Sequence, residues 1–251
     1  MGLPGRLFFV VQILVGLSVL LNPYPSFADI HGTLTGATNY VGRGYTKTQN
    51  DFAIQGNLDY EHSSGIYLGA SASNVNFGDR DYKDSARVEF APYLGYTHKL
   101  ADDWRVDVQW TRYLYDGKIF GRQADYNEFY VFLHYRDLLT LRASVSDNFY
   151  NQNKVTSDYE LTTRYPLTDY LEVSSGVGYS QVAKVLEYDY LYWNTGITGR
   201  YKFIAVDLRY MHAFEATTED TIEGTTKDKE IWDYEPEVLH ATIVFSISVG
   251  F

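Results

Sequence analysis

Apolar and polar residues alternate strictly through the last twelve residues of the chain, His240 to Phe251. Ala241, Ile243, Phe245, Ile247, Val249 and Phe251 share one side of an extended segment, whereas Thr242, Ser246, Ser248 and Gly250 fall mostly on the other. A period of two residues predicts a β-strand. This pattern is typical of a strand that faces lipid on one side and a water-filled lumen on the other.

Segments of about ten alternating residues, the length that spans an outer membrane, recur along the chain. We predict twelve strands, at 30–41, 53–62, 66–77, 86–97, 104–115, 126–136, 139–149, 156–165, 170–181, 189–201, 203–214 and 237–251. Short connections (63–65, 98–103, 137–138, 166–169 and 202) alternate with longer, more polar ones (42–52, 78–85, 116–125, 150–155, 182–188 and 215–236). An even strand count with this asymmetry predicts an all-β fold: a transmembrane antiparallel up-and-down β-barrel of outer-membrane type.

A helical membrane crossing does not fit the chain beyond Phe27. No later apolar stretch approaches the about 20 residues that a spanning helix needs, and a closed barrel is the other way to satisfy the backbone in lipid. Pro92 lies inside the predicted strand 86–97 and cannot donate a ladder hydrogen bond. We therefore expect a β-bulge near Pro92, or a break into two shorter strands.

The two ends of the chain predict its location. Arg6, an apolar run over residues 7–21 and the small-residue site Ser26-Phe27-Ala28 form the pattern of a secretory signal peptide. We expect cleavage after Ala28, leaving residues 29–251 as a single barrel domain with both termini periplasmic. The aromatic terminus Phe251 resembles the signal by which outer-membrane barrels are recognised, which implies periplasmic chaperones and the barrel-assembly machinery as partners during biogenesis.

Composition narrows the class further. The net charge is −11, and loss of residues 1–28 would remove Arg6 and no acid. An acidic exported chain is a poor nucleic-acid binder, because such binding depends on neutralising phosphates. There are no cysteines, so disulfides and thiol chemistry are excluded. The 24 tyrosines suit the membrane–water boundary, since each has an apolar ring and a polar hydroxyl.

Strand periodicity also predicts which charged side chains face the lumen. In 104–115, Trp104, Val106, Val108 and Trp110 face outward, so Arg105, Asp107 and Gln109 face inward. Arginine on the lipid face at mid-membrane would cost about 2–4 kcal/mol. The predicted basic lining is Arg87, Arg105, Arg142, Arg164, Arg200 and Arg209, and the acidic lining is Glu89, Asp107, Glu128, Glu160, Glu172 and Asp207. Asp59, Glu61, His134 and Asp158 also point inward by this rule.

The two cationic residue types are segregated along the chain. All lysines fall in predicted loops and turns, whereas most arginines fall inside strands. Arginine pairs carboxylates bidentately and stays charged. Two interpretations remain open: a porin eyelet with a transverse field, or a salt-bridge network that fills and braces a narrow barrel.

The segment 38–77 carries a pattern of its own. It contains Thr38-Asn-Tyr-Val-Gly-Arg-Gly-Tyr-Thr46, Gln55-Gly-Asn-Leu-Asp-Tyr-Glu-His-Ser-Ser-Gly-Ile-Tyr-Leu-Gly69 and Ser73-Asn-Val-Asn-Phe77. This resembles the TorF-family porin group, proteobacterial proteins also called Gcw_chp and classed as candidate porins. The motif positions are Arg43, Gly44, Asp59, Tyr60, His62 and Gly65, and the chain departs from the pattern at Asn39, Val41-Gly42 and Ala72. The resemblance implies a porin-like barrel and names no ligand.

Glycines on both sides of Arg43 allow the backbone to turn sharply where the first strand enters its loop. Arg43 could then fold inward at the outer mouth, and we expect it to bridge loop carboxylates rather than to contact solute. Ser63-Ser64-Gly65 is ordinary hairpin-turn chemistry.

The sequence gives little indication of a metal site or of an enzyme. None of the six histidines shows zinc-motif spacing, so no metal or cofactor is expected. A hydrolase at the barrel rim would need His212 near Ser73, Ser146 or Ser157, and the chain has no Gly-x-Ser-x-Gly turn. The acidic loop 215–236 either bridges divalent cations to lipopolysaccharide, focuses cations at the mouth, or is simply solvated. Trp232 and Tyr234 would then lie at the outer membrane boundary.

The sequence therefore predicts an outer-membrane, porin-like channel for passive diffusion of small hydrophilic solutes through a narrow charged lumen, and no enzyme. Its surroundings would be outer-membrane lipids and lipopolysaccharide. The alternatives are a closed structural or adhesion barrel that acts through its loops and, less favoured, a rim hydrolase.

If the predicted basic lining faces the solute path, replacing Arg105 or Arg142 with alanine will change the ion selectivity of the channel. Reversal potentials in planar bilayers under a salt gradient measure this. Unchanged selectivity would remove both residues from the lining.

Overall fold

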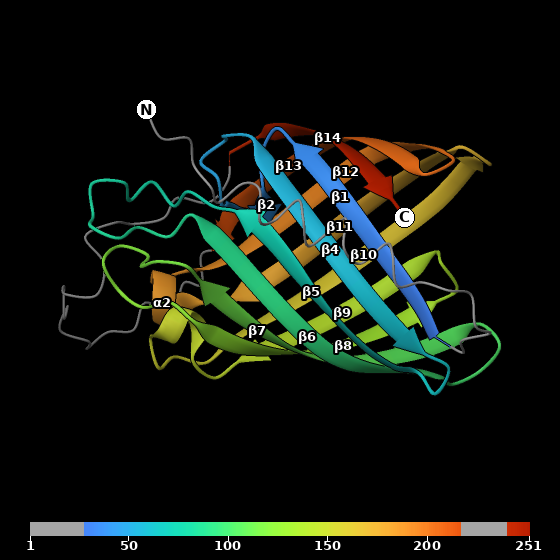
Figure 1. Ribbon diagram of the computed structural model, residues 1–251, viewed down its shortest axis with the longest axis horizontal. Coiled ribbons are helices and arrows are strands. Elements are labelled where there is room, and N and C mark those ends of the chain that lie inside the picture. The colour runs from blue at the N-terminus through green and yellow to red at the C-terminus, as the bar shows by residue number, and fades with distance from the viewer. Residues whose placement is uncertain (1–27, 217–239) are drawn as a thin grey trace, which may run out of the picture.

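The computed structural model describes residues 28–216 and 240–251 of the chain. One sheet of twelve antiparallel strands closes on itself into a barrel whose strands are strongly tilted (Figure 1). This confirms the predicted fold class. All but the last residue of the predicted signal peptide and most of the acidic loop, with Trp232 and Tyr234, lie outside the described residues.

Each wall strand pairs with its neighbours in the sequence, and the first strand closes the barrel against the last. The strands are β1 (Ala28–Ala37), β4 (Ala53–His62), β5 (Ile66–Asn74), β6 (Val88–Lys99), β7 (Trp104–Tyr115), β8 (Tyr126–Tyr135), β9 (Leu139–Ser146), β10 (Thr156–Thr168), β11 (Leu171–Gln181), β12 (Asp189–Tyr201), β13 (Ile204–Ala216) and β14 (Thr242–Gly250). Predicted and observed bounds coincide for β4, β7 and β12.

The alternation of residue types is explained by the two faces of the wall. On β14 the side chains of Ile243, Phe245 and Ile247 are exposed on the outer face, as an apolar surface against lipid requires. Exposed large apolar side chains recur on every wall strand. No helix among the described residues is long and apolar enough to cross a membrane.

Short turns gather at one end of the barrel, together with Ala28 and Phe251, and long connections gather at the other (Figure 1). We call these the turn end and the loop end. The loop-end connections carry small elements of their own: the hairpin β2 (Val41–Gly42) and β3 (Tyr45–Thr46), a 3-10 turn η1 (Phe149–Asn151) and a helix α2 (Ala183–Leu186).

The prediction of a bulge near Pro92 is wrong. The register of β6 stays constant on both sides, with Ala70 opposite Pro92 on β5 and the same offset before and after it on β7. Between Glu89 and Lys99, only the pairs at Ala91 and Pro92 are missing on the β7 side. A strand residue sends its N–H toward one neighbour only, so proline weakens one ladder locally and does not shift it. The register shift of this barrel lies between Pro166 and Thr168 on β10.

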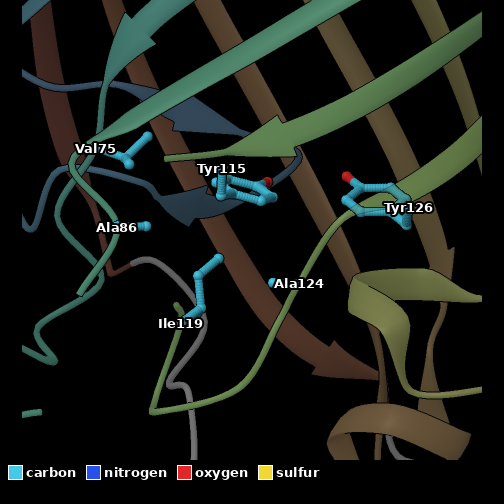
Figure 2. Packing of buried hydrophobic residues seen from close by; sticks show 6 residues of the cluster. All are labelled: Val75, Ala86, Tyr115, Ile119, Ala124 and Tyr126. Atoms are coloured by element: carbon cyan, nitrogen blue, oxygen red, sulfur yellow. The ribbon is translucent and has the colours of Figure 1, made fainter. Parts of the chain in front are cut away.

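At the loop end, apolar side chains of the connections pack against the ends of the wall strands. Tyr115, at the end of β7, and Tyr126, at the start of β8, pack with Val75, Ile119 and two alanines contributed by the loops (Figure 2). The parts of these loops next to the strands are therefore held against the barrel wall.

Glycines inside the strands make room for luminal tyrosine rings. Directly across from Gly178 on β11 lies Tyr192 on β12, and a Cβ on Gly178 would come within 2.1 Å of that ring. Tyr67 lies opposite Gly95 in the same way, at 2.2 Å. A residue without Cβ is thus required wherever a ring lies flat on the neighbouring strand.

The substitution Gly178→Ala should lower barrel stability by about 1–3 kcal/mol, because the added methyl forces the Tyr192 ring from its place. The matched control is Gly199→Ala, where a Cβ would meet nothing within 4 Å. Urea unfolding in detergent, followed by tryptophan fluorescence, compares the two, and equal midpoints would contradict this account.

Candidate functional site

The first loop-end connection folds back into the lumen as a two-stranded hairpin. Val41 pairs with Thr46 and Gly42 with Tyr45, which leaves Arg43 and Gly44 as a two-residue turn. Both turn residues have positive φ, 49° and 79°. Tight hairpins that match strand twist need positive φ at both positions, and glycine supplies it without strain at the second.

The tip of the hairpin lies on the inner wall of β12 and β13. A Cβ on Gly44 would be 2.8 Å from the Cβ of Ala213 and 2.9 Å from that of Tyr192, so only glycine allows this approach. Beside it, the Tyr45 ring meets the Tyr190 ring edge-on at 4.9 Å. The Tyr45 and Tyr188 hydroxyls are 2.8 Å apart.

Arg43 extends from this tip into the lumen and reaches two further strands of the wall, β8 and β10. Its Nη1 is 2.7 Å from both Glu128 Oε1 on β8 and Asp158 Oδ2 on β10. Its Nη2 donates to Glu128 Oε2 at 2.9 Å and to the Tyr130 hydroxyl at 2.8 Å. Burial opposes the charge of Arg43, but Asp158 and Glu128 outweigh it and hold the guanidinium pKa well above its usual value. The partners are wall carboxylates rather than the loop carboxylates that the sequence suggested.

A second cation of the same loop is buried beside the hairpin. Lys47 Nζ is 2.7 Å from Glu89 Oε2, and that carboxylate also accepts hydrogen bonds from the hydroxyls of Tyr40 and Tyr115. The ammonium lies 4.9 Å from the centre of the Tyr40 ring, a cation–π distance. Burial alone would lower the pKa of Lys47, but Glu89 raises it well above its usual value.

Three of the predicted luminal arginines are paired with predicted luminal acids. Arg142 meets Glu160 at 3.0 Å, Arg209 meets Asp207 at 3.0 Å, and Arg200 meets Glu172 at 3.3 Å. Arg164 donates to the Thr140 hydroxyl at 3.4 Å. Arg105 is exposed at the turn end of β7, and Arg87 precedes β6 and is exposed.

Asp59 and Asp107 are held by neutral partners instead. Tyr67 donates to Asp107 at 2.6 Å, and Asp59 accepts hydrogen bonds from Tyr93 and Asn57. In a ring of twelve strands each strand faces the one six positions away, so β5 faces β11 and β6 faces β12. The tyrosine-held carboxylates on β4 and β7 therefore lie across the lumen from the arginine-bearing strands β10 to β13.

The remaining motif residues contribute elsewhere. Tyr60 is on the outer face, 36% exposed. His62 and Gly65 belong to the turn between β4 and β5, where His62 Nδ1 lies 2.8 Å from the Ser64 hydroxyl and Gly65 has φ 89°.

Luminal tyrosines were missed by the sequence analysis, which assigned tyrosine to the membrane boundary. Tyr130 is two residues from the inward Glu128, so strand periodicity alone would have found it. Tyr113 is 2.6 Å from it, hydroxyl to hydroxyl. The lumen is therefore lined by hydroxyls and rings as well as by charges.

A cavity of about 620 Å³ opens beside the hairpin within the barrel. Its walls include Arg43, Tyr130, Arg142, Asp158 and Tyr190. Volumes of this size are typical of small-molecule sites.

The residues that the alternative rim hydrolase would need are not brought together. His212 lies on the outer face of β13, where its ring contacts Trp193 and Phe214. Ser146 faces inward on β9, and Ser157 is on β10, three strands from His212. Ser73 is on β5, where its hydroxyl donates to the Asn74 carbonyl. Among the described residues no group of three or more His, Asp or Glu side chains could hold a metal ion.

A closed twelve-stranded sheet, apolar outside and ionic within, with a loop folded into its lumen, defines an outer-membrane β-barrel of the porin type. The chain belongs to the family described as "Bacterial protein of unknown function (Gcw_chp)", whose model matches residues 26–245. No curated protein sequence matches the chain.

Solved porins share this fold. The KdgM porin is similar with a TM-score of 0.53 and 6% identity, over 88% of this chain and 98% of its own. A second KdgM structure, in complex with disordered oligogalacturonate, gives a TM-score of 0.51 at 6% identity, over 89% and 98%. The NanC porin gives 0.50 at 10% identity, over 88% and 98%.

Removing the buried ammonium in Lys47→Met should destabilise the barrel by about 3–5 kcal/mol, because Glu89 is left buried without a cation. Lys99→Ala, which breaks an ion pair whose two side chains are largely exposed, should change stability by about 1 kcal/mol or less. Denaturant midpoints in detergent test this pair of variants. Similar midpoints would show that Lys47 does not neutralise a buried charge.

Proposed function

We propose that the protein is a channel for passive diffusion of small hydrophilic solutes across the outer membrane. The observation that carries this proposal is the ionic, hydroxyl-rich lumen beside a 620 Å³ cavity. Well-packed apolar residues often stabilise a protein interior as well as buried ion pairs do, or better. A barrel that only had to be stable would have little need of this lining, whereas a path for hydrated solutes requires polar groups.

The charges of the lining favour a transverse field over a uniform one. Glu160, Glu172 and Asp207 are neutralised by arginines on the β9–β13 side. Asp59 and Asp107 have hydroxyl and amide partners on the β4–β7 side. A solute that passes between the two sides therefore meets carboxylates without a paired cation on one and charge-balanced arginine–carboxylate pairs on the other.

In this proposal the turn end is periplasmic, with both termini of the mature chain, and the loop end is extracellular. Short periplasmic turns and long outer loops are the rule in such barrels. The hairpin then narrows the channel from the outside. Lipid and lipopolysaccharide surround the wall, periplasmic chaperones and the barrel-assembly machinery act during biogenesis, and no residue is catalytic. The porin designation of the TorF group agrees with this assignment.

The similar barrels support a hydrophilic solute, since KdgM and NanC are named as porins and one KdgM structure was solved with oligogalacturonate. The second candidate is a closed structural or adhesion barrel. It is favoured by the reach of the hairpin loop, whose side chains contact β6, β8, β10 and β12 at once.

Replacing residues 41–46 by two glycines should raise single-channel conductance in planar bilayers, because it removes the hairpin from the lumen. Replacing residues 78–83 of another loop by two glycines is the control, and should leave conductance unchanged. Flat traces from both folded variants and from the parent protein would refute the channel and favour the closed barrel.

A further inference from the structure

We propose that Glu128 and Asp158 form a binding site for the guanidinium group of a cationic solute, and that Arg43 occupies this site when no solute is present. The inference rests on the proposed channel function, because the solute reaches the site through the lumen. It adds a solute class, organic cations with a guanidinium group, and it makes Arg43 a tethered occupant of the site.

The geometry around Arg43 is that of a bound ligand rather than of a wall residue. Arg43 comes from a loop, whereas its partners Glu128 and Asp158 belong to β8 and β10, and both carboxylates are almost fully buried, at 1% and 2% exposure. Glu128 accepts from both terminal nitrogens of the guanidinium. A fork of this kind matches a planar guanidinium better than a compact ammonium.

The charges at the site do not balance when Arg43 is present. One guanidinium lies between two carboxylates, whose other hydrogen-bond donors are hydroxyls: Tyr130 donates to Glu128 at 2.6 Å and Ser180 donates to Asp158 at 2.6 Å. Arg142, a further cation whose charge acts on Asp158, is itself paired with Glu160. Without a cation the two carboxylates would be buried together with no counter-charge, which is strongly unfavourable. The site therefore requires a cation from the loop or from solution.

Unpartnered hydroxyls beside the carboxylates also indicate a ligand. Ser146 and Thr156 face inward directly opposite each other on β9 and β10, each 1% exposed, and neither hydroxyl has a hydrogen-bond partner. Ser144 and Asp158 form another inward-facing pair on the same two strands. Ser146 and Thr156 are the next inward-facing pair in the direction of the loop end. Buried hydroxyls are normally satisfied, so this column offers further hydrogen bonds to a group larger than the Arg43 tip.

Two features around Arg43 favour its exchange for a solute. Arg43 has φ 49°, a left-handed conformation that costs a non-glycine residue free energy, and the adjoining strands are two residues each. The cavity borders Arg43, Tyr130, Asp158 and Ser180, so a solute inside it lies beside the Asp158 carboxylate and the Arg43 side chain that covers Glu128. A guanidinium solute can thus replace Arg43 by exchange of equivalent hydrogen bonds.

Calorimetric titration of methylguanidinium into folded Arg43→Ala protein in detergent tests the site without relying on conduction. We expect saturable binding that Glu128→Gln in the same background weakens by about tenfold or more, with weaker binding of tetramethylammonium and potassium. Lys47→Ala is the matched control: it loosens the same loop but leaves Arg43 in place, so methylguanidinium must displace Arg43 there and should bind more weakly than to Arg43→Ala. Equal binding by Arg43→Ala and Lys47→Ala, or no effect of Glu128→Gln, would overturn the proposal.

If Arg43→Ala does not fold alone, methylguanidinium in the refolding buffer should restore β-structure measured by circular dichroism, and tetramethylammonium should not. Absence of this rescue would overturn the site as well. Bilayer recording on the same protein separates the two proposals. Binding without conductance would leave the site and refute the channel, whereas conductance without binding would leave the channel and refute the site.

Discussion

Every backbone N–H and C=O group that crosses a lipid bilayer must find a partner within the protein, and the rest of this structure depends on that constraint. Twelve strands meet it by closing into one sheet, with β1 paired to both β4 and β14. Closure then divides every strand into a lipid-facing side and a luminal side. The apolar side chains of Ile243 and Phe245 and the ion pairs of Arg142 and Arg209 are two results of the same alternation.

The carboxylates inside the lumen have two kinds of partner, arginines on one side and neutral hydroxyl groups on the other. Arginine–carboxylate pairs on β9 to β13 neutralise each other along one side, whereas tyrosine hydroxyls hold Asp59 and Asp107 on the other. Strand glycines allow the rings of Tyr67 and Tyr192 to lie against the wall, so the rings line the path without standing across it. The obstruction at the loop end comes from the hairpin at 41–46 and the adjoining Lys47, and this segment brings two cations, Arg43 and Lys47, to buried carboxylates.

Much of the fold could be predicted from sequence because lipid imposes a period of two on every strand. The bounds of β4, β7 and β12 follow from that period, and so does the inward direction of Glu128 and Asp158. The two-residue period does not predict which side chains contact each other across the lumen. Arg43 and Lys47 lie in a loop whose path has no periodicity, so their pairing with β8, β10 and β6 could not be predicted. Tyr130 was missed for another reason, since residue type was given more weight than position, and Pro92 was assigned a bulge that the constant register of β6 does not show.

The position of the hairpin in the lumen also affects how the barrel is held closed between β1 and β14. β1 and β14 share five residue pairs, whereas β1 and β4 share ten, which makes the junction of the two chain ends the shorter of these ladders. The hairpin leaves the loop end of β1, passes behind β14 and rests on β13 and β12 through Gly44. It therefore bridges the β1–β14 junction on the luminal side. The same segment that narrows the lumen also connects β1 to β12 and β13.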